Sequence, residues 1–219
     1  MASASVEYMP DQATFAEPFV FVAERLWLDF VNSDDAARRR NGTHADALNS
    51  FESFVRWLTE ARLIDQERGF ALQRRAQQQP TGASGALHEA RRLRSVLRTL
   101  AERRSPDAEG TTQAAIGEIN RVLGRSAGTR RVEPRTDGGF VRNFVTVGDV
   151  FAGLLVPVIE SAADALVNGE LVRVHSCADP RCPRVFFDSS RNGKRRWCEM
   201  STCGNRAKAA RHRRKLKLG

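Results

Sequence analysis

Four cysteines, Cys177, Cys182, Cys198 and Cys203, are the residues whose type and spacing point most clearly to chemistry. They form two pairs, with four residues inside each pair and 15 residues between the pairs. Two thiolate pairs at this separation are the usual layout of a four-cysteine zinc site, in which each pair comes from a tight turn. Asp179-Pro180 supplies a turn former in the first pair. We predict one structural zinc ion, because four sulfur ligands leave no position for water or substrate.

The same cysteines allow other interpretations. Two disulfides would suit an oxidising compartment, but residues 1–12 lack a basic segment followed by an apolar one. We therefore expect a cytoplasmic protein with reduced thiols. Four unrelated buried cysteines would leave the paired spacing without a reason. His175 or His212 could replace a cysteine as ligand, although we expect His175 to end a strand and His212 to lie among helical basic residues.

Positive charge is concentrated at one end of the chain. The formal net charge is +9, yet residues 191–219 contain eleven lysines or arginines and one acid. The other 190 residues carry 24 basic and 25 acidic groups, so the whole excess lies in this C-terminal segment. Such asymmetry favours a polyanionic partner, either nucleic acid or an acidic surface. A solvated, solubilising tail is the alternative interpretation.

The sequence predicts a short hairpin between the cysteine pairs and a helix after them. Val185–Phe187 favours a strand, and Asn192-Gly193 suits a hairpin turn whose two central residues need positive φ. We expect strands near 184–189 and 194–198. The alanine-rich basic run from Cys203 to Leu216 predicts a helix that holds the last ligand in its first turn. Knuckle, hairpin and basic helix together make a treble-clef-like zinc finger.

The predicted helix is short, and its like charges repel at i,i+3 and i,i+4 spacing, so it cannot be stable alone. We expect zinc to anchor it and nucleic-acid phosphate to relieve the repulsion. Gly204 could let the backbone approach the metal or a phosphate. Arg206, Asn205 and Asn192 are candidates for base contact, whereas the other cations would mainly contact phosphate. The predicted nucleic-acid-binding residues are Arg191, Asn192, Lys194, Arg195, Arg196, Asn205, Arg206, Lys208, Arg211, Arg213, Arg214 and Lys215.

The run from Ser190 to Lys208 resembles the bacterial CGNR zinc-finger family, which is named for the motif at Cys203–Arg206. Both cysteine pairs match the spacing of that family. In such proteins the finger follows an ABATE domain, described as a stress-induced transcription regulator. Leu28–Ser33 resembles the opening motif of that domain, LDFVNT, with Ser33 in place of Thr. This chain has Ala23-Glu24 where the family has small glycines. The resemblance implies a stress-responsive regulator that binds zinc and DNA.

The N-terminal part predicts a mostly helical α+β domain with a few short strands. We place this domain at 15–168 and the finger at 171–217. Apolar spacing predicts strands at 19–22 and 171–174 and a hairpin at Asp137-Gly138. It also predicts helices that begin at Leu26, after the capping pair Asn49 and Glu52, and after Asp65, and further helices at 87–101, 112–123 and 149–167. We expect Pro157 to kink the last helix, Gly169 to end it, and residues 80–85 to form a linker-like loop.

Polar residues of the N-terminal domain favour structural roles. Asp29 and Asn32 lie three apart on one helix face, where a ligand pocket is one interpretation and a satisfied buried pair is the better one. The helix at 87–101 carries Arg94 on its apolar side and a second basic face that we expect to be solvated and paired with acids. That face consists of Arg91, Arg92, Arg98 and Arg103.

We predict a nucleic-acid-binding transcriptional regulator, DNA-directed, whose N-terminal domain senses a signal or forms a homodimer. The alternative is an adaptor that binds RNA or an acidic protein surface through the finger. No apolar stretch approaches the ~18–20 residues needed to cross a bilayer, so we expect no membrane span. We also expect no enzymatic activity, because the chain lacks a Walker loop and the G-x-S-x-G and H-E-x-x-H motifs.

Overall fold

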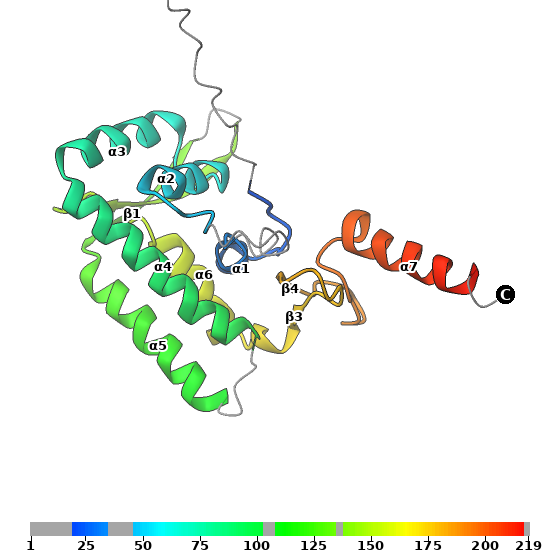
Figure 1. Ribbon diagram of the computed structural model, residues 1–219. Coiled ribbons are helices and arrows are strands. Elements are labelled where there is room, and N and C mark those ends of the chain that lie inside the picture. The colour runs from blue at the N-terminus through cyan, green and yellow to red at the C-terminus, as the bar shows by residue number, and fades with distance from the viewer. Residues whose placement is uncertain (1–18, 35–45, 103–107, 135–137, 217–219) are drawn as a thin grey trace, which may run out of the picture.

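Helices dominate the structure and pack into a body from which the C-terminal helix projects (Figure 1). The computed structural model describes residues 19–34, 46–102, 108–134 and 138–216. The helices are α1 (Leu26–Val31), α2 (Phe51–Glu60), α3 (Gln66–Gln78), α4 (Pro80–Glu102), α5 (Ala108–Arg125), α6 (Val156–Val167) and α7 (Asn205–Leu216). The strands form two antiparallel pairs, β1 (Gly128–Pro134) with β2 (Phe140–Thr146), and β3 (Val174–Ser176) with β4 (Val185–Phe187). The predicted α+β class is confirmed. Among the described residues, no helix has the length and apolarity that a bilayer crossing requires.

The six-residue helix α1 lies at the centre of the hydrophobic core. Its Trp27 and Phe30 are fully buried, and the Phe30 ring meets that of Trp57 edge-on with 4.9 Å between centroids. A helix this short has no stability of its own, so packing against neighbours must hold it. It contacts α4 and α6 of the body and also β4 near the C-terminal end of the chain. The core therefore continues from the body into the C-terminal part.

The turn before α1 is held by a half-buried aspartate, Asp29. Asp29 accepts hydrogen bonds from the backbone N–H groups of Val22 and Ala23, each 3.0 Å long. Glu24 adopts φ 62°, a left-handed conformation that glycine adopts most easily, at a position where the resembling family has glycines. Burial raises the pKa of Asp29 to about 6, although the two backbone hydrogen bonds oppose that shift. Asp29 is thus a satisfied polar group, as predicted, although it is half-buried rather than fully buried.

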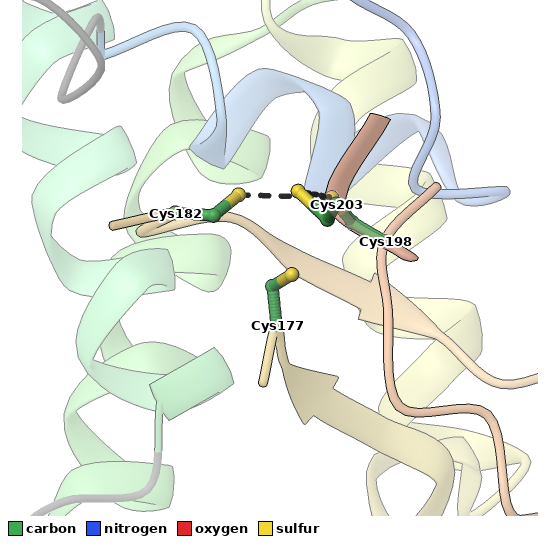
Figure 2. A group of neighbouring side chains, drawn as sticks. All are labelled: Cys177, Cys182, Cys198 and Cys203. Carbon is green, nitrogen blue, oxygen red and sulfur yellow. Dashed lines mark hydrogen bonds between the residues drawn. The ribbon is translucent and has the colours of Figure 1, made fainter. Parts of the chain in front are cut away.

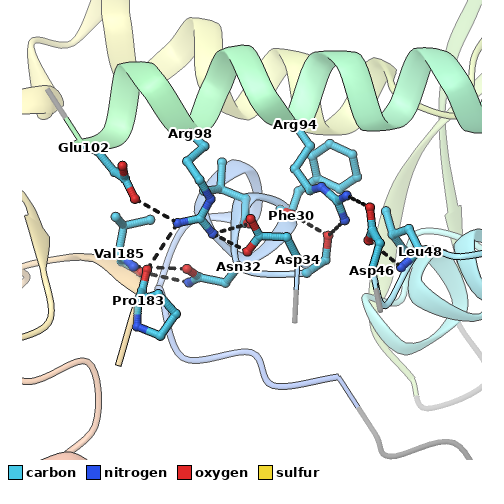
Figure 3. A network of polar contacts seen from close by, with 12 residues as sticks. Phe30, Asn32, Asp34, Asp46, Leu48, Arg94, Arg98, Glu102, Pro183 and Val185 are labelled. Atoms are coloured by element: carbon cyan, nitrogen blue, oxygen red, sulfur yellow. Dashed lines mark hydrogen bonds and ion pairs between the residues drawn. The ribbon is translucent and has the colours of Figure 1, made fainter. Parts of the chain in front are cut away.

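Arginines of α4 bind acids and carbonyls inside the body (Figure 3). Arg94 is buried, donates to Ser33 at 3.3 Å and forms an ion pair with Asp46. Arg98 is also largely enclosed, and its side chain is 16% exposed. Arg91 donates to the Leu48 carbonyl at 2.8 Å and Arg92 pairs with Glu118 at 3.1 Å. The expected pairing with acids is found, but Arg98 is not solvated as predicted; Arg103 lies outside the described residues.

Two prolines stand in the first turn of a helix where the sequence predicted a loop and a kink. Pro80 opens α4, so the expected loop at 80–85 is helical. Gly82 in that turn lies against the ring of Phe151, which is only 3.0 Å from where a Cβ would stand. Pro157 stands in the first turn of α6, and the predicted helix start at 149 is wrong by seven residues. Proline suits a first turn because the N–H it lacks has no helical partner there.

Other predicted boundaries also change. Residues 19–22 form no strand, and residues 170–173 form a 3-10 turn that leads into β3. The cap of α2 is the reciprocal pair Ser50 and Ser53 rather than Asn49 and Glu52. The predicted cap at Asp65, the antiparallel pairing of β1 with β2, and the left-handed Gly169 after α6 are confirmed. Asp137 of the predicted hairpin turn lies outside the described residues. Helix α5 extends four residues further at its start and includes Gly124.

The raised pKa of Asp29 predicts a pH-dependent cost to stability. The folded protein retains a proton there between about pH 4 and 6 that the unfolded chain loses, so this contribution falls as pH rises through that window. We expect Asp29→Asn to gain stability relative to the wild type by about 2 kcal/mol between pH 4.5 and pH 7. Denaturant unfolding at both pH values measures this difference. A difference that does not change with pH would contradict the assignment.

Candidate metal centre and basic surface

The four cysteine sulfurs converge on one point (Figure 2). All four Sγ atoms lie within 4.8 Å of one another, and Cys198 Sγ is 3.7 Å from the sulfurs of both Cys182 and Cys203. A tetrahedral zinc ion with bonds of ~2.3 Å requires sulfurs about 3.8 Å apart, so the geometry fits. Cys177, Cys198 and Cys203 are buried and Cys182 is partly exposed. The predicted ligands therefore form one closed zinc site with four sulfur ligands.

Two tight turns deliver the sulfurs. In the first turn the N–H of Cys182 donates to the Asp179 carbonyl at 2.8 Å, and the N–H of Cys177 donates to the Arg184 carbonyl at 2.9 Å. In the second pair, Cys203 lies in a π-helical turn, Met200–Gly204, that precedes α7. The last ligand therefore stands two residues before α7 begins at Asn205, rather than in the first turn of that helix as predicted.

The crowding of sulfurs explains why a cation belongs here. Sulfur contacts with Cys177 and Cys182, together with burial, raise the pKa of Cys198 far above its ordinary value. Four thiolates cannot share this volume unless a cation offsets their charge. A zinc ion held by these four cysteines would supply that charge, with the thiols deprotonated. The site therefore stabilises the folded state only with its metal, as expected for a structural zinc.

Arg206 connects the two cysteine turns across the metal centre. Its Nε donates to the Asp179 carboxylate at 2.7 Å and its Nη2 donates to Cys203 Sγ at 2.9 Å. Burial alone would raise the pKa of Asp179, but the Arg181 N–H and the Arg206 guanidinium outweigh it and hold this pKa below its ordinary value. Arg206 was a candidate for base contact; its guanidinium instead braces the zinc ligands, because an ionised acid and a sulfur lie within its reach.

The two residues between Cys203 and Arg206 also have structural surroundings. The side chain of Met200 lies where a Cβ at Gly204 would stand, so the glycine makes room for this methionine rather than for the metal or a phosphate. Asn205 donates its amide to the Ser201 carbonyl at 2.9 Å while remaining exposed. The Cys203–Arg206 motif is therefore mainly the structural end of the zinc site.

The body binds both backbone groups of Val185 through one side chain (Figure 3). The Asn32 amide donates to the Val185 carbonyl at 2.8 Å, and its carbonyl accepts the Val185 N–H at 3.0 Å. Beside it, Arg98 donates to the carbonyls of Val31 at 2.8 Å and Pro183 at 3.2 Å. Asn32 is therefore a satisfied polar group as predicted, and it fixes the finger to α1.

The predicted hairpin of the finger is wrong, because β4 has other partners on both edges. Strand β3 pairs with one edge, while the Phe187 N–H on the other edge donates to the Ala23 carbonyl at 3.0 Å. Residues 194–198 therefore have no free edge to join. Buried Asp188 turns the chain instead, accepting the N–H groups of Ser190 and Arg195, each at 2.8 Å. Positive φ was expected at both Asn192 and Gly193, but only Gly193 has it, with φ 61°.

Arg195 was predicted to bind nucleic acid, but it lies in the contact between the body and the finger, which we call the joint. Its guanidinium forms an ion pair with Glu24 and lies 4.7 Å from the centroid of the Phe186 ring. Its Nε donates to the Trp197 carbonyl at 2.9 Å. The ion pair ties the finger to the left-handed turn before α1. Arg195 is thus committed to internal contacts, because buried carbonyls and an aromatic ring surround it.

The other predicted nucleic-acid-binding residues form the exposed surface of the loop and α7. They are Arg191, Asn192, Lys194, Arg196, Asn205, Lys208, Arg211, Arg213, Arg214 and Lys215. Helix α7 buries none of its side chains and projects away from the body (Figure 1). We call α7 together with the exposed residues of the loop 191–196, Arg195 excluded, the basic surface. Sequence reasoning missed Asp179, Asn32 and Arg98 as supports of this surface, because each acts on a residue distant in the sequence.

A zinc site of four cysteines with a cationic helix attached defines a zinc-finger protein. The family comparison is more specific: a model of the ABATE domain, described as "Putative stress-induced transcription regulator", matches residues 24–169, and a model of the CGNR zinc finger matches residues 173–215. The first match covers more than half of the chain, so the chain belongs to the ABATE family and ends in a CGNR zinc finger. No curated protein matches it.

Removal of Arg206 is expected to loosen the metal. Arg206→Ala takes away the hydrogen bonds to Cys203 and Asp179, and partners of ligands typically contribute 10- to 100-fold to metal affinity. Competition with a chromogenic chelator should show zinc affinity lower by about that factor. Arg211→Ala removes an equal charge from the exposed side of α7 and should leave zinc affinity unchanged. Equal affinities in the two variants would contradict the bracing role.

Removal of Asn32 is expected to weaken the joint between body and finger. Asn32→Ala leaves the N–H and carbonyl of Val185 unpaired in a buried place, which should cost about 2–4 kcal/mol. Denaturant unfolding of the zinc-loaded protein measures this cost. Asn120→Ala, on the exposed face of α5, is the matched control and should change stability by less than about 0.5 kcal/mol. A similarly small effect of Asn32→Ala would contradict the role of Asn32 in fixing the finger to α1.

Proposed function

We propose that this protein is a DNA-binding transcription regulator whose zinc ion is structural. The observation that carries the proposal is α7, a helix with no buried side chain that continues directly from the zinc-site turn. A helix without an apolar face gains little by packing on protein. Its charges repel one another, and phosphate would relieve that repulsion. In this proposal the zinc site and the side chains that support it hold α7 in position to contact DNA.

The dimensions and charge of the basic surface support duplex DNA. Helix α7 has 12 residues, about 18 Å at 1.5 Å per residue, and it contains no acid. The major groove of B-form DNA, ~12 Å wide, accepts an α-helix. The exposed loop adds Arg191, Lys194 and Arg196 beside the helix. Most of these cations would contact phosphate and set affinity, whereas few would read bases.

The body contributes the regulatory half of the proposal. The ABATE description as a stress-induced transcription regulator supports such a role. Because Asn32 and Ala23 hold β4, a change at α1, on ligand binding or in a homodimer, would alter the direction of α7. Thiols kept for a metal suit the reducing cytoplasm, where we place the protein. The signal would be any ligand or partner that changes the packing around α1.

Salt dependence tests the DNA-binding proposal. The logarithm of affinity for duplex DNA should fall steeply with the logarithm of salt concentration, with a slope of roughly −4 to −7 if most of the basic surface contacts phosphate. Replacing Arg211 and Lys215 by glutamine should make the slope shallower by about 2. Chelation of zinc should abolish binding, because the helix loses its anchor.

The control removes equal charge elsewhere. Glutamine at Arg74 and Arg125, both exposed on the body, should leave the salt slope unchanged. A flat salt response of the wild-type protein would overturn the proposal. Retention of a protein partner after nuclease treatment, without retention on DNA, would favour an adaptor, and preference for structured RNA would favour an RNA-binding protein.

A further inference from the structure

We infer that α7 reads DNA sequence through one ridge that contains neither lysine nor arginine. The ridge consists of Asn205, Ala209, His212 and Leu216, and we call it the reading ridge. At 3.6 residues per turn, positions i, i+4, i+7 and i+11 lie on one side of a helix. All four residues are exposed. This inference rests on the proposed DNA binding and adds to it the residues that face the bases.

The reading ridge points away from the finger. The finger-facing side of α7 is marked by Arg206 and Ala207, which are half-buried, and by the contacts of Arg206 with Asp179 and Cys203. Asn205 is anchored at the start of the ridge, because its amide donates to the Ser201 carbonyl. The ridge is therefore presented in a fixed direction by the zinc site, and a partner can reach it.

Cations border the reading ridge on both sides. Lys208, Arg211 and Lys215 follow one another along one side at i, i+3 and i+7. Arg213 lies on the other side, and all four of these cations are exposed. An uncharged line between two charged borders matches a surface with negative walls and a neutral floor. A flat acidic surface would be matched better by cations at the centre of the contact.

The major groove of duplex DNA has this shape, since phosphates form its walls and base edges form its floor. Small and apolar side chains such as Ala209 and Leu216 can pack against thymine methyl groups, and Asn205 and His212 can hydrogen-bond to base edges. The major groove of A-form RNA is too deep and narrow for a helix. Duplex DNA is therefore the partner that this arrangement favours.

The structure leaves Asn205 as the strongest of the three base-contact candidates named from sequence. Arg206 is engaged by Asp179 and Cys203. Asn192 accepts the Lys194 N–H at 3.3 Å and the Ser190 hydroxyl at 3.2 Å, so it stabilises its own turn. Ala209 and His212 were not predicted from the sequence to contact bases, because the side of α7 that is free to face DNA depends on how the finger orients the helix.

The test compares the same substitution on two sides of the helix. A preferred site is first selected from random duplex DNA with the full-length, zinc-loaded protein. Ala209→Leu places bulk on the reading ridge and should lower affinity for that site about 10- to 100-fold, with affinity for unrelated duplex nearly unchanged. Ala210→Leu adds the same side chain about 100° round the helix and should leave the ratio of the two affinities unchanged. Neither position is buried, so folding is not at risk.

A second variant separates reading from charge. Arg213→Gln should weaken binding to both duplexes equally and make the salt slope shallower by about 1. Three results would contradict the assignment of the reading ridge. They are equal effects of Ala209→Leu and Ala210→Leu on the affinity ratio, a selection that enriches no sequence, and better competition by structured RNA than by duplex DNA. Salt-dependent binding to duplex DNA would still support the proposed function in the first two cases. Absence of any duplex binding by the wild type would overturn both.

Discussion

Four sulfurs held within 4.8 Å of one another form the constraint on which the C-terminal part depends. Ionised sulfurs at this distance repel, so the loops that carry them can meet only around a divalent cation. Once they meet, Arg206 can bridge Asp179 and Cys203, and α7 can start in a fixed direction. Nothing else in α7 supplies such a direction, since the helix buries no side chain.

The joint between body and finger is part of the same construction. One edge of β4 pairs with β3 inside the finger, and the other receives Ala23 and Asn32 from the body. The three residues of β4 are buried and belong to the common hydrophobic core. The body thus does more than carry the finger: it helps to fix the segment that positions the first cysteine pair, which couples the helical domain to the metal centre.

The sequence was informative where the chemistry is local. Cysteine spacing determined the ligand set, and alanine with lysine and arginine determined the helix, because neither depends on distant residues. The hairpin predicted between strands near 184–189 and 194–198 does not form, because Ala23 and Asn32, more than 150 residues away, occupy the edge of β4. Pro80 and Pro157 were recognised as breaks, yet only the packed structure decides that they begin helices. The predictions that Arg206 and Arg195 contact nucleic acid failed for a related reason. An arginine that makes internal contacts cannot be distinguished in a sequence from one that binds phosphate.

The shared core around β4 also bears on how such chains can evolve. A finger joined through a flexible linker can be exchanged between proteins as a unit. Here the exchange of one half would bring a foreign strand against Asn32 and leave Phe187 without the Ala23 carbonyl. Recombination at this boundary would therefore yield folded chimeras only when both halves preserve matching surfaces.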